Sequence, residues 1–204
     1  MVWCRVKSGG VGFCNLLYGK DDKMKIEIEI TGLTPLLMNR FNIDEQGLKK
    51  DKNITPREAA QRVCYEDEKQ RLYYPTTNIY ACLIEAGKYH KEGKCKVTTA
   101  RSSLIPAGVM IEGEYIFFAK PKTWEVDSRS VVVPSTGGRI VCHRPRLDEW
   151  VLTFTLILDT KMFTAKFIRL LVDDAGSKVG LGDFRPARKG IFGRFCVTNW
   201  IEKK

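Results

Sequence analysis

The sequence has no apolar run long enough to cross a lipid bilayer, no CxxC pair and only two histidines. Apolar stretches such as VLTFTLIL and VVV have the length of a strand, whereas a membrane helix needs about 18 or more apolar residues. The seven cysteines have no regular spacing, so neither a disulfide framework nor a zinc ribbon is indicated. We therefore expect a soluble protein of the reducing cytoplasm, without membrane contact, bound metal or cofactor.

The sequence also lacks the two common glycine motifs that hold nucleotide phosphates. Gly180 and Gly182 form a GxG pair, but Arg185 stands where a dinucleotide-binding fingerprint needs its third glycine. A P-loop is excluded as well, because residues 187–189 are Ala-Arg-Lys where glycine, lysine and a hydroxyl residue are required. Neither pattern predicts a bound nucleotide cofactor.

Positive charge is abundant and concentrated in two stretches of the chain, whose formal net charge is +10. Residues 129–146 carry four arginines and no acidic residue, and residues 176–204 carry seven basic residues against two acidic ones. Clustered like charges repel one another unless a polyanion binds, so nucleic acid is the favoured class of partner. The alternative is a basic surface that serves solubility alone.

Regular patterning begins only after the first part of the chain. Residues 1–23 have no sustained period and are interrupted by glycines, whereas a clean alternation follows Met24. We interpret residues 1–23 as an N-terminal extension outside the core, with Met24 as an alternative to Met1 as the native start. The remaining residues, 24–204, suit a single domain, since 44% of the whole chain is hydrophobic.

The expected elements favour the α+β class. Alternating, β-branched and aromatic residues predict strands at 25–31, 71–75, 110–118, 129–134, 138–144, 150–158 and 194–201. Helices are predicted at 55–63, where Thr55 begins a capping box, from Thr76 or Thr77 to His90, and from Phe163 to Ala175 with Gly176 as C-cap. This order predicts a mainly antiparallel, ferredoxin-like or RNA-recognition-type sheet with helices on one face, elaborated by a β-hairpin near residues 129–146.

The segment GLGDFRPARKGIFGRF, residues 180–195, combines glycines, cations and phenylalanines. Glycine amides can approach a phosphate chain closely, and arginines add charge and forked hydrogen bonds. Phe184 and Phe192 could stack on bases, although Phe192 and Phe195 also suit the core, and an ordinary turn is the alternative for the whole segment. The candidate nucleic-acid-binding residues, with basic residues from elsewhere included, are Gly180, Gly182, Phe184, Arg185, Arg188, Lys189, Gly190, Gly193, Arg194, Arg40, Arg129, Arg139, His143, Arg144 and Arg146.

Three blocks of the sequence resemble the RAMP superfamily of CRISPR-associated RNA-binding proteins, especially the subunits that coat guide RNA, and its small phage or mobile-element relatives. TGLTPLLMNR (31–40) resembles the first strand and its exit, LYYPTTNIYACLIEAG (72–87) the strand-ending proline with the following helix, and VGLGDFRPARKGIFGRF (179–195) the C-terminal glycine-rich signature. RPRLDEWVLTF (144–154) is similar to the phage-type relatives. The resemblance implies an RNA-recognition-type core, RNA backbone bound by the glycine loop, side-by-side assembly of copies along the strand, and a prokaryotic or phage-infected cell.

Two alternatives to a binding protein stay open at this point. An endoribonuclease needs an acid or base near the scissile phosphate, and His143 and His90 are the candidates. Capping of a helix C-terminus would explain His90 without catalysis, and phosphate contact would explain His143. The second alternative is a phage structural or interaction protein with an acidic partner. We favour a non-enzymatic protein that binds single-stranded RNA or DNA, with RNA preferred.

Overall fold

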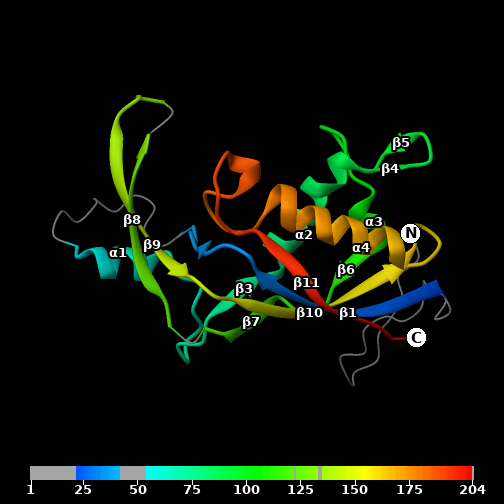
Figure 1. The fold of residues 1–204 in the computed structure, drawn as a ribbon, viewed down its shortest axis with the longest axis horizontal. Helices are drawn as coiled ribbons and strands as arrows, with labels where there is room; N and C mark the ends of the chain where they lie inside the picture. The colour runs from blue at the N-terminus through cyan, green and yellow to red at the C-terminus, as the bar shows by residue number, and fades with distance from the viewer. Residues whose placement is uncertain (1–21, 42–53, 122, 133–134, 204) are drawn as a thin grey trace, which may run out of the picture.

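The computed structural model describes residues 22–41, 54–121, 123–132 and 135–203. These residues form an α+β protein with antiparallel sheets (Figure 1). The strands are β1 (Lys23–Gly32), β2 (Leu36–Leu37), β3 (Tyr73–Pro75), β4 (Lys91–Glu92), β5 (Cys95–Lys96), β6 (Val109–Ile111), β7 (Tyr115–Lys120), β8 (Glu125–Val132), β9 (Arg139–Leu147), β10 (Val151–Asp159) and β11 (Phe195–Lys203). The helices are α1 (Pro56–Arg62), α2 (Thr76–Ala86), α3 (Ile105–Gly108) and α4 (Ala165–Asp174).

The predicted N-terminal extension falls almost entirely outside the described residues, which begin at Asp22. Its last two residues belong to the fold, because Lys23 starts β1 and the backbone amide of Thr160 donates to the Asp22 carbonyl at 2.9 Å. Among the helices of the described residues, none has the length and apolar character of a membrane span.

The main sheet has the strand order β11-β1-β10-β7-β3, and β6 pairs with β10 beside β7. The alternation of β1 places Ile26, Ile28 and Ile30 on one face, where each is fully buried. These isoleucines lie opposite buried β10 residues, namely Leu156, Phe154 and Leu152. The predicted strand at 25–31 with one buried face is therefore confirmed.

Helices α2 and α4 lie on the same side of the main sheet (Figure 1). Helix α1 has the predicted capping box, in which the Thr55 hydroxyl accepts from the Glu58 amide and the Glu58 carboxylate accepts from the Thr55 amide.

The predicted threonine cap of α2 is wrong. Pro75 occupies the cap position, and the Thr76 hydroxyl donates to the Gly113 carbonyl at 2.7 Å in the β6–β7 turn.

The predicted C-cap at Gly176 is also wrong. After α4 the chain continues into a π-helix, Ala175–Val179, in which Gly176 is buried. A β-carbon at Gly176 would lie 2.2 Å from the Phe195 carbonyl oxygen. Glycine is required here because the π-helix packs directly against the backbone of β11, and not because the helix ends.

The predicted basic hairpin is present and is longer than the sequence pattern suggested. β8 and β9 pair from Glu125 opposite Arg146 to Val132 opposite Arg139, and β2 adds a third strand beside β9. Figure 1 shows the hairpin projecting away from the main sheet. The basic side chains of the hairpin therefore lie on a projecting arm, and β2 pairs with this arm near the end of β9.

Three shorter segments complete the fold. Residues 91–96 form the β4–β5 hairpin around Gly93, whose φ of +59° suits glycine. The predicted strand 110–118 is divided into β6 and β7 at Gly113, with φ of +81°. The segment before α3 forms a bridge between Thr98 and Ser103.

Candidate nucleic-acid interface

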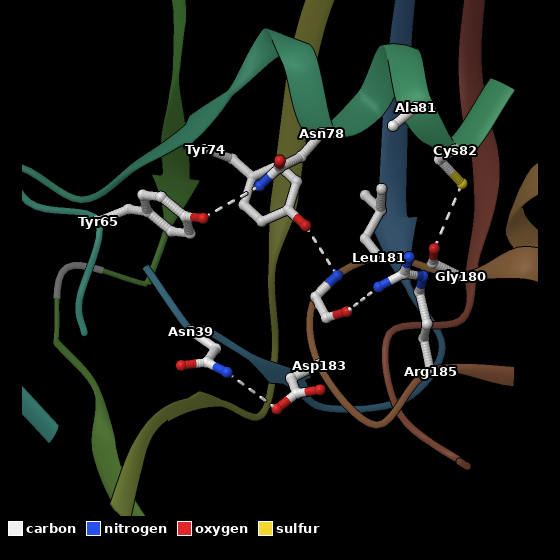
Figure 2. Close-up of a pocket in the computed structure, with 11 residues that line it drawn as sticks. Asn39, Tyr65, Tyr74, Asn78, Ala81, Cys82, Gly180, Leu181, Asp183 and Arg185 are labelled. Atoms are coloured by element: carbon white, nitrogen blue, oxygen red, sulfur yellow. Dashed lines mark hydrogen bonds between the residues drawn. The ribbon is translucent and has the colours of Figure 1, made fainter. Parts of the chain in front are cut away.

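The glycine-rich segment, residues 180–195, uses its glycine amides inside the protein. Gly180 donates to Ala175, Gly190 to Arg185 and Gly193 to Pro35 through backbone bonds of 2.8–2.9 Å. The Gly182 amide donates to the Tyr74 hydroxyl at 2.7 Å (Figure 2). Because all four donors are occupied, the expectation that these glycine amides contact a phosphate chain does not hold.

Close packing explains why glycine occupies these positions. A β-carbon at Gly190 would lie 1.7 Å from the Phe184 carbonyl oxygen, and one at Gly193 would lie 1.8 Å from that of Leu181. Gly180 and Gly182 have φ angles of +75° and +73°, in the left-handed region that favours glycine. The glycines therefore determine the backbone path of the segment, and its side chains are the groups that face outward from it only where they are exposed, as at Phe184, Arg188, Lys189 and Arg194.

The four cations of the glycine-rich segment have different surroundings. The Arg185 guanidinium donates to the Gly182 carbonyl at 2.8 Å, and that of Arg194 donates to the Ser177 carbonyl. The side chains of Arg188 and Lys189 are exposed and have no hydrogen bond or ion pair with any described residue. None of the four forms an ion pair with a described carboxylate, so their positive charge is not neutralised locally.

Three of the four hairpin arginines, in contrast, are paired with carboxylates. Arg144 is 8% exposed, and its Nε atom lies 2.7 Å from Asp183 of the glycine-rich segment. Arg129 donates to Asp127 at 2.6 Å. Arg146 donates to Asp148 at 2.7 Å. Of these pairs, only Arg144–Asp183 joins the hairpin to another segment, because Asp127 and Asp148 each lie two residues from their partners. The charge of all three arginines is partly neutralised within the protein.

Phe192 joins the hairpin to the glycine-rich segment. Its ring is 5% exposed, and the guanidinium carbons of Arg129 and Arg146 lie 4.7 Å and 5.9 Å from the ring centre. Such cation–π contacts hold the two elements together. Phe184 has 44% of its surface exposed, whereas Phe195 has 4%. Of the two proposed stacking rings only Phe184 is accessible, and Phe192 and Phe195 are core residues.

The remaining predicted basic residues lie on the β8–β9 hairpin or just beyond β2. His143 Nδ1 is 2.7 Å from the Ser128 hydroxyl across the hairpin. Arg139 is exposed at the far end of β9, opposite Val132, and is separated from the junction by the length of the hairpin. Arg40 is exposed just beyond β2, and its backbone amide donates to the Val63 carbonyl at 2.8 Å.

His90 has a partner that the sequence did not reveal. Its Nε2 atom lies 3.0 Å from the Asp174 carboxylate at the end of α4, and its ring meets Phe167 edge-on with centroids 5.5 Å apart. Both contacts place the His90 ring against α4. Across the described part of the chain, no group of three or more histidine, cysteine or acidic side chains is arranged to hold a metal ion.

A cavity of about 240 Å³ lies beside the glycine-rich segment, and the sequence analysis did not identify it (Figure 2). Its polar lining comes from the residues after β2, the segment between α1 and β3, β3 itself, the first turn of α2 and the glycine-rich segment. It comprises Asn39, Tyr65, Tyr74, Asn78, Asp183 and Arg185. Asn39 donates to Asp183 at 3.2 Å. The only sequence signal was the tyrosine pair before Pro75, which is typical of a buried strand as well.

Burial controls the ionisation of two groups at this cavity. It raises the pKa of the Tyr74 hydroxyl, which therefore stays protonated at neutral pH. It also raises the pKa of the Cys82 thiol to about 12, and this thiol contacts the Gly180 carbonyl at 3.3 Å. Both groups are thus neutral at physiological pH, the tyrosine as a hydrogen-bond donor and the cysteine as a core side chain.

The comparisons with known proteins support a fold assignment. No protein-family model and no curated protein matches the sequence. The fold is similar to that of a chain in a cryo-EM structure of the Type III-B Cmr-beta bound to cognate target RNA, with a TM-score of 0.53 and 10% sequence identity. The match covers 90% of this chain and 62% of the other, so this chain spans less than two thirds of the matched one. At 10% sequence identity, this similarity shows a shared fold.

Proposed function

We propose that this protein binds single-stranded nucleic acid, with RNA preferred, where the glycine-rich segment meets the β8–β9 hairpin. The observation that carries the proposal is the junction formed by the Arg144–Asp183 ion pair and the buried Phe192 ring. The junction links the two stretches in which positive charge is concentrated, residues 129–146 and 176–204. A cationic surface assembled from two distant segments is the electrostatic signature of a polyanion site.

The residues would divide into contacting and positioning groups. Arg188 and Lys189 have unpaired charges and would contact phosphates, with Arg194, Arg139 and Arg40 as further exposed cations. The exposed ring of Phe184 would stack on a base, a contact worth roughly 1–3 kcal/mol in single-strand complexes. The paired hairpin arginines, namely Arg129, Arg144 and Arg146, would hold the arm in place.

We further propose that the core is a ferredoxin-like sheet of the RAMP type. The order β11-β1-β10-β6, with α2 between β1 and β6 in the chain and α4 between β10 and β11, supports this assignment. The β8–β9 hairpin would then be an insertion before the third core strand. The matched solved chain belongs to a structure bound to target RNA, which supports RNA as the ligand class.

The direct test is titration of labelled single-stranded RNA and DNA at several salt concentrations. Each neutralised phosphate on a single strand contributes about 0.7 to the slope of log affinity against log salt. We expect binding that weakens steeply with salt and is stronger for RNA than for DNA of the same sequence. Absent binding, or affinity independent of salt, would contradict the proposal.

A further inference from the structure

The cavity beside Tyr74 contains a buried hydrogen-bond donor for which the described residues supply no acceptor (Figure 2). Tyr74 is 2% exposed, and its oxygen accepts the Gly182 amide, but its own proton has no acceptor among the described residues. Buried polar groups in native proteins are normally paired with protein, water or a ligand. The raised pKa of this hydroxyl means that the proton is present at neutral pH. A ligand that supplies an acceptor would complete the site.

Other groups of the same cavity are also only partly used. Asn78 donates to the Tyr65 hydroxyl at 3.3 Å, which leaves the Asn78 carbonyl oxygen and the Tyr65 proton without partners in the described residues. The Asp183 carboxylate accepts from the Asn39 side chain and from the Phe184 backbone amide, and it faces Arg144. The cavity therefore offers both donors and acceptors at its surface.

This mixture fits a nucleobase better than a phosphate group. A phosphate supplies only acceptors, whereas the edge of a base carries donors and acceptors together and so matches both kinds of group in the cavity. The ring of Tyr65 and the apolar side chains of Ala81 and Leu181 line the remaining wall and suit a planar ring. Ala81 and Asn39 are exposed, so the cavity is open to solvent.

We propose that the cavity receives one unstacked base of the bound strand and holds its hydrogen-bonding edge between Tyr74, Asn78 and Asp183. This inference rests on the proposed function, because the strand must first be held by the basic surface. The glycine-rich segment serves both sites, since Asp183 and Arg185 line the cavity while Arg188 and Lys189 carry the unpaired charges. Single-stranded ligands allow this arrangement because their bases can turn out of the stack.

The test compares two labelled RNA strands of equal length, one with all its bases and one with abasic sugars. Wild-type protein should prefer the base-bearing strand. Asn78→Leu, which keeps the size of the side chain and removes its amide, should reduce that preference about fivefold, the effect of one lost hydrogen bond. Tyr74→Phe should have a similar effect. Thr77→Ala, at an exposed neighbour that does not line the cavity, is the matched control and should keep the preference.

The outcomes separate this inference from the proposed function. Equal, salt-dependent binding of both strands, or a preference that survives unchanged in Asn78→Leu, would overturn the base cavity while binding along the basic surface stands. Failure of both strands to bind would overturn both. Tyr74→Phe also removes the acceptor of the Gly182 amide. If that variant does not fold, Asn78→Leu decides the test, because its side chain accepts no bond from the glycine-rich segment.

Discussion

Gly190 illustrates a residue whose role is steric. A β-carbon there would lie 1.7 Å from the Phe184 carbonyl oxygen, which belongs to the backbone and cannot move away freely. We expect Gly190→Ala to lower the free energy of unfolding by roughly 1–3 kcal/mol, as overpacking does elsewhere. Chemical denaturation measures this loss. Gly138→Ala is the control, because its nearest neighbouring atom would be 3.4 Å away. Unchanged stability of Gly190→Ala would show that the packing is looser than described.

Arg188 and Lys189 provide the sharpest test of the phosphate contacts. Replacing both with alanine should weaken RNA binding and lower the salt slope by about 1.4, since each contributes one single-strand phosphate contact of about 0.7. Fluorescence anisotropy at several salt concentrations measures both quantities. The control replaces Arg101 and Lys166, two exposed cations outside the glycine-rich segment, and so removes the same charge. An equal loss in the control would indicate that only net charge matters.

The cysteines should differ in reactivity. Burial raises the pKa of the Cys64 and Cys82 thiols to about 12, whereas Cys95 is exposed. Because the thiolate is the reactive form, alkylation at pH 8 should label Cys95 rapidly and leave the two buried thiols protected until denaturant is added. Site-resolved mass spectrometry checks this. As these folded-state pKa values are raised from 9.0, the thiols should reduce stability only as pH rises above about 9.

At the scale of elements, the Arg144–Asp183 pair should determine how firmly the hairpin is attached. Asp183→Asn would leave the guanidinium of Arg144, which is 8% exposed, without its counter-charge. We expect a loss on the order of 2 kcal/mol in the free energy of unfolding, below the range for fully buried pairs because Asp183 is partly exposed.

Asp148→Asn is the matched control for that variant. Its partner Arg146 is a similar distance away, but the Asp148 side chain is 50% exposed. Exposed pairs contribute about 0–1 kcal/mol, so little change is expected. Equal losses of unfolding free energy in the two variants would mean that the Arg144–Asp183 pair stabilises the protein no more than an exposed ion pair does.

Local patterns predicted the elements well where neighbouring residues determine the structure. Alternation in β1 and the capping box of α1 both depend on residues within a few positions, and both were confirmed. The assignments of Thr76 and Gly176 were wrong because each position is determined by a residue far along the chain, Gly113 for the first and Phe195 for the second. Sequence periodicity contains no information on such contacts.

In the candidate site, too, local sequence predicted some features, and contacts between distant residues determine the others. Composition identified the cations of residues 180–195 and of the hairpin, but not which of them are neutralised. That distinction depends on the Arg144–Asp183 pair, which forms only when the hairpin meets the glycine-rich segment. The cavity around Tyr74 was missed for the same reason, since its polar groups come from five separate parts of the chain.

At the scale of the whole molecule, the RAMP resemblance implies side-by-side assembly, which is a further prediction. A long single-stranded RNA should bind several copies, whereas a strand that fits one basic surface should bind one. Mass photometry of the protein with strands of increasing length measures the number bound. A fixed count of one copy on every strand would contradict assembly along the RNA and leave the single-copy interface to be tested separately.

Ultraviolet crosslinking of the intact protein to single-stranded RNA, with the attached residues located by mass spectrometry, tests the central claim most directly. We predict crosslinks at the exposed Phe184 and in the peptide that contains Arg188 and Lys189, with additional sites on the β8–β9 hairpin. Crosslinks confined to regions outside the glycine-rich segment and the hairpin, or none at all, would contradict the claim that these two elements form the nucleic-acid interface.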